Sequence, residues 1–252
     1  MEMQFNEVGF TIIKDFFDKQ LIEEVKEAIV TFDKWDLLRK KDVVYEGDEA
    51  ERNYKYIQNI NYYVPACHKL LTSRLFDKVS ELLEEEIYFV NMEIHNKVPK
   101  QGTFTPAHQD NFYFQLSPPS SLTAYIPLEM HNAKVNGGLK FLKGTNKLGT
   151  LNHKSSTVKA FSSLLELENP EDYEEYNTDL DAGDIVFHHA NTVHYADDNK
   201  SEHHRRSLSL RFNGVSAKID PSIREQYKKN YKVKRKTELE ENKFKINLKI
   251  QT

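Results

Sequence analysis

Two stretches in the first third of the chain repeat apolar residues at the spacing of an amphipathic helix. The first covers residues 15–32 and the second covers residues 66–85. Apolar residues every three to four positions form one stripe along a helix, and that stripe packs against a core. The two stripes consist of Leu21, Ile22, Val25, Ala28, Ile29 and Phe32, and of Leu70, Leu71, Leu75, Phe76, Val79, Leu82 and Leu83.

The pattern changes between Ile87 and Phe212. Short β-rich runs alternate there with turns of Gly, Pro and Asn, which is typical of an antiparallel sandwich or barrel. Helices followed by strands predict a mainly β fold with flanking helices, built on a double-stranded β-helix, the jelly-roll or cupin-like core. Residues 155–178 are acidic and irregular, so we expect a surface loop with a short helix there.

We expect one domain over residues 1–216 and a C-terminal tail over residues 217–252. The tail is expected to be helical and either to pack on the domain or to extend from it. Its basic run is compatible with a solvated helix or with a docking segment for an anionic partner. The run consists of Lys228, Lys229, Lys232, Lys234, Arg235 and Lys236.

Composition suits an enzyme without nucleic-acid or membrane partners. The chain has 252 residues, of which 38% are hydrophobic and 12% aromatic, and its formal net charge is −4. The single cysteine, Cys67, rules out an intramolecular disulfide and a thiolate metal cluster, and we expect it in the core. The sequence has no apolar run that could span a bilayer, and its first residues do not resemble a signal peptide. We therefore expect a cytoplasmic monomer or homodimer.

The segment His108-Gln109-Asp110 is the strongest chemical signal. Alternate residues of a β-strand point to the same face, so His108 and Asp110 can bind one metal ion while Gln109 points away. His194 follows a turn at Gly183 and an apolar strand, and it can complete a facial triad from a second strand. Two histidines and one carboxylate are the ligands of mononuclear non-heme iron(II) oxygenases, and they leave three coordination positions open.

Other histidines offer alternatives. His188 and His189 lie close to His194 in the sequence and could replace it as the third ligand. Strand alternation turns one of these two inward, where it could also serve in packing. His203 and His204, in a polar stretch, could contribute to a zinc site instead.

Arg205 or Arg206 could bind the far carboxylate of a keto-acid cosubstrate, since a guanidinium holds a carboxylate with two hydrogen bonds. The two arginines fall on opposite faces of the strand that their segment predicts. A polar face suits an enzyme cavity, so we predict Arg205, together with Ser207, as the anchor. The polar face contains Arg205, Ser207, Ser209 and Arg211, and the apolar face contains Arg206, Leu208, Leu210 and Phe212.

The chain resembles the phytanoyl-CoA dioxygenase family of iron(II)/2-oxoglutarate oxygenases. The resemblance spans roughly residues 9–214, in the order of the family and near its spacing. It rests on GFTIIKDFF at 9–17, NKVP at 96–99, HQDNFYF at 108–114, LTAYIPLE at 122–129, NGGLKFLKGT at 136–145, and the segments 183–194 and 205–209. One departure is Thr145-Asn146, where the family often has Ser-His.

The resemblance implies Fe(II) as the metal and 2-oxoglutarate and O2 as cosubstrates. It implies His108, Asp110 and His194 as the catalytic metal ligands, because His194 lies at the family's distance from Arg205. It also places Tyr125 over the cosubstrate and Tyr56 where a polar group reaches it. Related halogenases of the family lack the carboxylate ligand, so Asp110 favours hydroxylation.

We expect the substrate to be a small-molecule metabolite or a biosynthetic intermediate, with succinate and carbon dioxide as coproducts. No cluster of Lys and Arg suited to a coenzyme A thioester precedes the tail. A non-catalytic, cupin-like metal-binding or ligand-binding module is the alternative, and the intact triad with Arg205 argues against it. The expected pocket residues are Asn111, Phe112, Tyr113 and Phe114, with Tyr62 and Tyr63; His95 is equally compatible with substrate contact and with packing.

Overall fold

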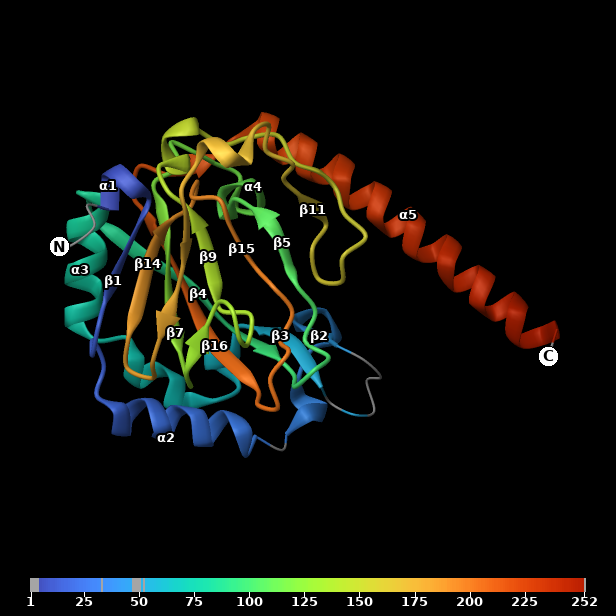
Figure 1. Cartoon of the computed structure of the whole chain (residues 1–252), viewed down its shortest axis with the longest axis horizontal. Helices are drawn as coiled ribbons and strands as arrows, with labels where there is room; N and C mark the ends of the chain where they lie inside the picture. The colour runs from blue at the N-terminus through green and yellow to red at the C-terminus, as the bar shows by residue number, and fades with distance from the viewer. Residues whose placement is uncertain (1–4, 33, 47–50, 52, 252) are drawn as a thin grey trace.

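Two antiparallel sheets lie face to face in the computed structural model, which describes residues 5–32, 34–46, 51 and 53–251, with side chains up to residue 240 (Figure 1). The larger sheet has the order β1 (Phe10–Ile13), β14 (Ile185–His189), β7 (Ser121–Pro127), β16 (Arg205–Gly214), β4 (Ile87–Lys97), β3 (Tyr54–Gln58) and β2 (Val43–Tyr45). The smaller sheet has the order β12 (Glu175–Asn177), β9 (Leu139–Leu142), β15 (His194–Ala196) and β5 (Thr105–His108). The expected mainly β jelly-roll with flanking helices is confirmed.

Alternation along the strands divides the larger sheet into two faces. Residues such as Ile94, Leu208 and Leu210 point outward and pack against the N-terminal helices, forming the main hydrophobic core. On the inner face, Phe10 stacks on Phe141 of the smaller sheet with 4.5 Å between ring centroids. The inner face therefore faces the space between the sheets, and part of that space is the cavity described below.

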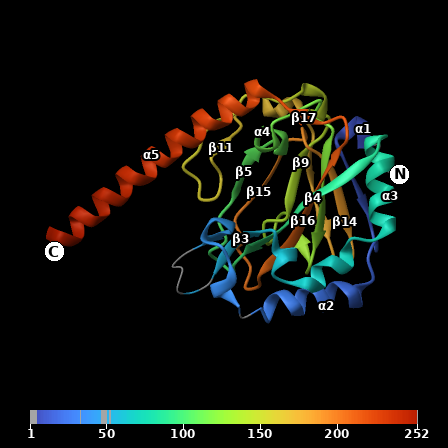
Figure 2. The same cartoon turned by 180° about the vertical axis from the view of Figure 1, so that it is seen from behind.

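The N-terminal helices are shorter than the sequence pattern predicts. The helix expected over residues 15–32 is α2 (Lys19–Val30), which begins after Asp18 because the Asp18 carboxylate accepts hydrogen bonds from the first backbone N–H groups. The helix expected over residues 66–85 is divided into the 3₁₀ helix η5 (Pro65–Leu70) and α3 (Ser73–Leu83), with Thr72 capping α3. Both helices cover the outer face of the larger sheet (Figures 1 and 2).

The remaining elements are short. The region expected as a loop over residues 155–178 contains the 3₁₀ helix η7 (Pro170–Asp172) and short strands. The further bounds are α1 (Phe5–Val8), η1 (Trp35–Leu37), η2 (Lys40–Asp42), η4 (Ile60–Tyr62), α4 (Asp110–Phe114), η6 (Thr145–Leu148), and the strand pairs β6 (Leu116–Ser117) with β17 (Lys218–Ile219), β8 (His131–Asn132) with β13 (Asp179–Leu180), and β10 (Lys154–Ser155) with β11 (Ser163–Leu164).

The C-terminal helix α5 (Pro221–Gln251) starts at the body of the molecule and extends away from it (Figure 1). It contacts the pair β10 and β11, where Asn230 Nδ2 donates to the O atom of His153, just before β10, at 2.8 Å and to Ser163 Oγ, at the start of β11, at 3.0 Å. None of the helices in the described ranges is long and apolar enough to cross a membrane.

Candidate active site

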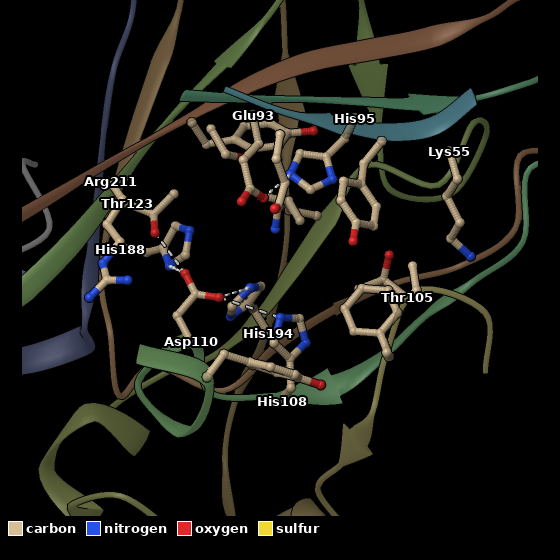
Figure 3. A pocket seen from close by; sticks show the side chains of 18 of the residues that line it. Lys55, Glu93, His95, Thr105, His108, Asp110, Thr123, His188, His194 and Arg211 are labelled. Atoms are coloured by element: carbon tan, nitrogen blue, oxygen red, sulfur yellow. Dashed lines mark hydrogen bonds and ion pairs between the residues drawn. The ribbon is translucent and has the colours of Figure 1, made fainter. Parts of the chain in front are cut away.

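A cavity of about 230 Å³ lies between the two sheets. Its wall from the larger sheet is the polar inner face of β3, β4, β7 and β16, and its wall from the smaller sheet includes the ends of β5 and β15 (Figure 3). Because consecutive inward residues of neighbouring strands are in register, residues distant in the sequence form rows across this wall. One row contains Thr123, Arg211 and Asn91, and the next contains Tyr125, Ser209, Glu93 and Gln58.

His108 and Asp110 point toward the same side, as predicted, but not because both lie on a strand. His108 is the last residue of β5, and Asp110 is the first residue of the short helix α4. Gln109 between them keeps an extended backbone, with φ −111° and ψ 132°, so the alternation continues one step beyond the strand. The Gln109 side chain points away and donates to Asn191 O at 2.7 Å.

Three side chains converge in a geometry that suits a metal ion. Ligand atoms of His108, Asp110 and His194 all lie within 4.8 Å of one another. Asp110 Oδ1 is 3.4 Å from His108 Nε2 and 3.6 Å from His194 Nε2. His203 and His204 belong to no such group of three among the residues that the structure describes.

The backbone fixes the tautomer of both histidines. His108 Nδ1 donates to Pro106 O at 2.8 Å, and His194 Nδ1 donates to Thr192 O at 3.0 Å. Each Nε2 therefore presents a lone pair to the cavity, which is the arrangement that metal-binding histidines adopt. Burial, followed by the neighbouring His108, lowers the pKa of His194 well below its usual value, so this ring is neutral and able to bind a metal.

Asp110 is held as an anion. Burial by itself would raise the pKa of Asp110, but the surrounding histidines, His194 first, outweigh it and bring the pKa well below the usual value. Its second oxygen, Oδ2, accepts a hydrogen bond from Thr123 Oγ1 at 2.7 Å. Thr123 thus orients the carboxylate so that Oδ1 faces the two histidines.

His188 and His189 point to opposite sides of β14. His188 is buried and lines the cavity, and its Nδ1 is 3.9 Å from Asp110 Oδ2. It lies behind Asp110, outside the group of three ligands (Figure 3). His189 points away from the cavity and accepts a hydrogen bond from the Asn191 N–H at 3.0 Å. The geometry therefore favours His194 over both as the third ligand.

Arg205 lies buried on the cavity wall. Its Nη1 donates to Tyr125 Oη at 2.6 Å, and Tyr125 Oη in turn donates to His131 Nδ1 at 2.8 Å. His131 Nε2 donates to Arg206 O at 2.8 Å, so its Nδ1 is free to accept from the tyrosine. Arg205 Nε is buried and makes no hydrogen bond to any described residue, and Ser207 Oγ is buried beside Tyr125. This end of the cavity thus offers donors without acceptors, as a carboxylate site requires.

Arg206 points to the other side of β16, as the alternation predicts. Its Nη1 donates to Glu129 Oε1 at 3.1 Å, so its charge is already paired with a carboxylate.

Two expected pocket residues are placed elsewhere. Asn111 Nδ2 donates to Leu116 O at 2.9 Å, and the Phe112 ring stacks on His153, so neither lines the cavity. The assignment of these two was wrong because residues 110–114 form a helical turn, which turns only Tyr113 and Phe114, also expected in the pocket, toward the cavity.

The other expected residues divide in the same way. Tyr56 and His95 line the cavity wall. Tyr62 is 70% exposed, and Tyr63 Oη donates to Asp42 at 2.9 Å, so neither is part of the cavity. Cys67 is buried in the core, as expected.

Several cavity residues received no role from the sequence. Glu93, Lys97 and Arg211 all line the cavity, and burial lowers the pKa of Lys97 well below its usual value. The available signal was alternation on β16, which puts Arg211 on the same face as Arg205. Glu93 and Lys97 can be recognised as cavity residues only once β4 is known to pair with β16.

A jelly-roll with a His-Asp-His group and a buried arginine in one cavity defines the class of non-heme iron(II)/2-oxoglutarate oxygenases. The chain belongs to the phytanoyl-CoA dioxygenase family, whose model matches residues 5–207. The protein is therefore a 2-oxoglutarate-dependent non-heme iron dioxygenase, with Fe(II) as its metal.

Characterised relatives are distant in sequence. The chain is 24% identical to a 2-aminoethylphosphonate dioxygenase from the uncultured bacterium HF130_AEPn_1 over 84% of this chain and 80% of the relative. It is 25% identical to the peroxisomal phytanoyl-CoA dioxygenase of Bos taurus, over 82% of this chain and 66% of the relative.

Solved structures share the fold at still lower identity. The enzyme EctD from S. alaskensis, solved with 2-oxoglutarate and 5-hydroxyectoine, superposes with a TM-score of 0.72 at 17% identity, over 86% of this chain and 76% of EctD. The non-heme alpha ketoglutarate dependent epimerase SnoN from nogalamycin biosynthesis superposes with a TM-score of 0.67 at 22% identity, over 86% of this chain and 83% of SnoN.

Proposed function

We propose that this dioxygenase hydroxylates a small-molecule metabolite or biosynthetic intermediate in the cavity between its sheets, and converts 2-oxoglutarate into succinate and carbon dioxide. The observation on which the proposal rests is the convergence of His108, Asp110 and His194 within 4.8 Å inside a cavity that also contains Arg205.

The donor set fits iron(II). His108 and His194 supply neutral imidazole nitrogens, and Asp110 supplies one negative charge, which together form a facial triad. Bound iron supplies the activation of oxygen, and the protein supplies orientation and the exclusion of water. Thr123 keeps the Asp110 carboxylate in position, and the rigid backbone contacts of both histidines do the same for the imidazoles.

Arg205 is proposed to bind the far carboxylate of 2-oxoglutarate. Arg205 Nε, which is buried and without a partner among the described residues, supplies a donor, and Ser207 Oγ, buried beside Tyr125, is proposed as a second. Tyr125 holds the guanidinium from the side, and His131 holds Tyr125. Tyr56, on the same wall, is proposed to contact the cosubstrate as well.

The size and lining of the cavity support a small substrate. A cavity of about 230 Å³ must contain the cosubstrate together with the reacting part of the substrate, which favours a compact molecule. Tyr113, whose ring lies 5.8 Å from that of His108, and His95 are proposed to contact the substrate. The name of one relative, a 2-aminoethylphosphonate dioxygenase, is in line with a small polar substrate.

Turnover under labelled oxygen gas tests the reaction type. With Fe(II), 2-oxoglutarate and a stimulating metabolite, in buffer containing chloride, one labelled oxygen atom should enter the product. Asp110 would occupy the coordination position that a halide needs, and its charge would disfavour a second anion. Chlorinated product would contradict hydroxylation, and turnover on protein or nucleic acid alone would contradict the substrate class.

Three further expectations are retained as proposals. A cytoplasmic location is supported by the need to keep iron(II) reduced and by the free thiol of Cys67. The protein is proposed to act as a monomer or homodimer. The division into a domain at 1–216 and a tail at 217–252 is supported by the position of α5, which begins at Pro221.

A further inference from the structure

Two residues of opposite charge line the cavity on two neighbouring strands of the larger sheet. Arg211 is on β16 and Glu93 is on β4. Arg211 is in register with Asn91, and Glu93 is in register with Ser209, so the two charged residues are diagonal neighbours on one face. Diagonal neighbours on paired strands are about 7–8 Å apart. Figure 3 shows Arg211 on the side of Asp110 away from His108 and His194, and Glu93 next to His95.

Arg211 is charged but has no counterion. Its guanidinium lies over the Phe114 ring, with 3.7 Å from Cζ to the ring centroid, and its Nε donates to Asn213 Oδ1 at 3.1 Å. No carboxylate lies within ion-pair distance of Arg211 among the described residues. By contrast, Arg206 on the opposite face is paired with Glu129.

Glu93 is held by neutral groups. Its Oε1 accepts a hydrogen bond from Asn91 Nδ2 at 3.0 Å, and Gln58 is a further hydrogen-bonding neighbour. His95 Nε2 is 3.7 Å from Glu93 Oε2, but burial and then Arg205 lower the pKa of His95 to about 4, so this ring is neutral near pH 7. The Glu93 side chain is 25% exposed, and the exposed part faces the cavity.

Leaving both groups without an opposite charge is expensive for the fold, and at Glu93 this cost appears as the rise of its pKa to about 7. Removing a charged group from water costs several kcal/mol unless a partner of opposite charge or enough hydrogen bonds compensate. Phe114 and Asn213 hold the guanidinium, and Asn91 and Gln58 hold the carboxylate, so each group has neutral contacts of its own and the two do not form an ion pair with each other. A ligand with both charges would satisfy both residues at once.

We propose that the substrate is a small zwitterion, with an amine that binds Glu93 and a carboxylate, phosphonate or sulfonate that binds Arg211. This inference deepens the proposed function and rests on it. Arg211, Glu93 and Asp110 line the same cavity, so in this proposal the carbon chain between the two charged ends of the ligand lies in the cavity that also contains the metal ligands. The site of oxidation is a carbon between those ends.

The ionisation of the two residues agrees with this arrangement. Burial raises the pKa of Glu93 to about 7, and a bound ammonium group would favour its charged form. Burial lowers the pKa of Arg211 to about 10, which leaves the guanidinium charged at neutral pH.

Calorimetric titration without oxygen tests the proposal on the protein loaded with iron(II) and 2-oxoglutarate. The probes are α-, β- and γ-amino acids and their phosphonate and sulfonate counterparts, such as β-alanine, 2-aminoethylphosphonate and taurine. Each has two matched analogues, one without the amine (propionate, ethylphosphonate, ethanesulfonate) and one without the acid (ethylamine). At least one zwitterion should bind, and removing either charge should weaken its binding at least about tenfold.

Two variants assign the charges. In Arg211→Met, the analogue without the acid should bind almost as well as the zwitterion, while the analogue without the amine should still bind more weakly. In Glu93→Gln, the analogue without the amine should bind almost as well as the zwitterion, while the analogue without the acid should still bind more weakly. Arg206→Met and Glu129→Gln, an ion pair on the opposite face of the same sheet, are the matched controls and should keep both penalties. Melting temperatures verify that every variant is folded.

The outcomes separate this inference from the proposed function. Binding of single-charge analogues as tight as the zwitterion, unchanged penalties in both variants, or no zwitterion bound overturns the inference. Succinate formation in air, measured separately, tests the oxygenase. A protein that binds a zwitterion but forms no succinate would overturn the proposed function and leave the inference standing.

Discussion

Arg205 and Arg206 are neighbours in the chain, yet they lie on opposite faces of β16. Arg205 has a buried Nε without a partner among the described residues, whereas Arg206 is paired with Glu129. Of the two, only Arg205 lines the cavity and can present an unused donor to a ligand there, and this difference follows from strand alternation.

We predict that Arg205→Ala raises the concentration of 2-oxoglutarate needed for half-maximal succinate formation at least about tenfold, because a charge-assisted bidentate contact is lost. Arg206→Ala should change this concentration less than about twofold. Arg205→Lys is a useful control, since it keeps the charge but loses the paired donors. Equal effects of the two alanine variants, or a larger effect of Arg206→Ala, would contradict the assignment.

At the scale of single residues, the sequence predicts which side chains face the cavity wherever this depends only on alternation along one strand. His108, Asp110 and Arg205 face the cavity because inward residues recur at every second position. His131 and Glu93 could not be found in this way. The contact of His131 with Tyr125, and the position of Glu93 next to the row that contains Arg211, depend on which strands are paired. A single sequence does not specify the order of the strands.

The C-terminal helix α5 stabilises a segment over the cavity. Lys234 Nζ donates to Val158 O and Phe161 O, both at 2.6 Å. Phe161 lines the cavity, with its ring 5.3 Å from the His108 ring. A side chain on the tail thus fixes the backbone next to a metal ligand, which is more than a solvated helix would do.

We predict that Lys234→Met loosens this segment, because two backbone carbonyls lose their donor. Amide hydrogen exchange over residues 156–162 should become faster, and the KM for the substrate should rise a few-fold while the affinity for iron stays within about twofold. Lys232→Met, two residues away on the exposed side of the helix, is the control and should have neither effect. Faster exchange in both variants would indicate general fraying of α5 instead.

The sequence predicts the type of the helices and strands more accurately than where they begin and end. Apolar periodicity predicts α2 and α3, but it does not show where each helix starts. The caps Asp18 and Thr72 start the helices later in the sequence than the predicted ranges do. The helical turn α4 was missed because five residues are too few for a period to appear. The strand order of both sheets was likewise beyond a reading of local pattern.

For the whole molecule, the proposed metal ligands connect segments that are distant in the sequence. His108 and Asp110 flank the end of β5, and His194 begins β15, which pairs with β5. A metal bound there stabilises the folded state only, by about 2.7 kcal/mol at one hundred times the dissociation constant.

We therefore predict that iron(II), added without oxygen, raises the melting temperature by roughly 5–10 °C at that excess. His194→Ala should abolish the rise, since it removes one of three ligands, and His188→Ala should retain most of it. Differential scanning calorimetry of the two variants, with and without metal, provides the measurement. A rise that persists in His194→Ala but is lost in His188→Ala would reverse the assignment of the third ligand.

The position of β16 in the larger sheet has a consequence for how the protein is made. This strand lies between β7 and β4, yet it is synthesised about a hundred residues after β4. Because the ribosome adds roughly 5–20 residues per second, β7 and β4 remain without this partner strand for about 5–20 seconds. The sheet can close only after residue 214 has emerged, so we expect the nascent chain to depend on chaperones over that interval.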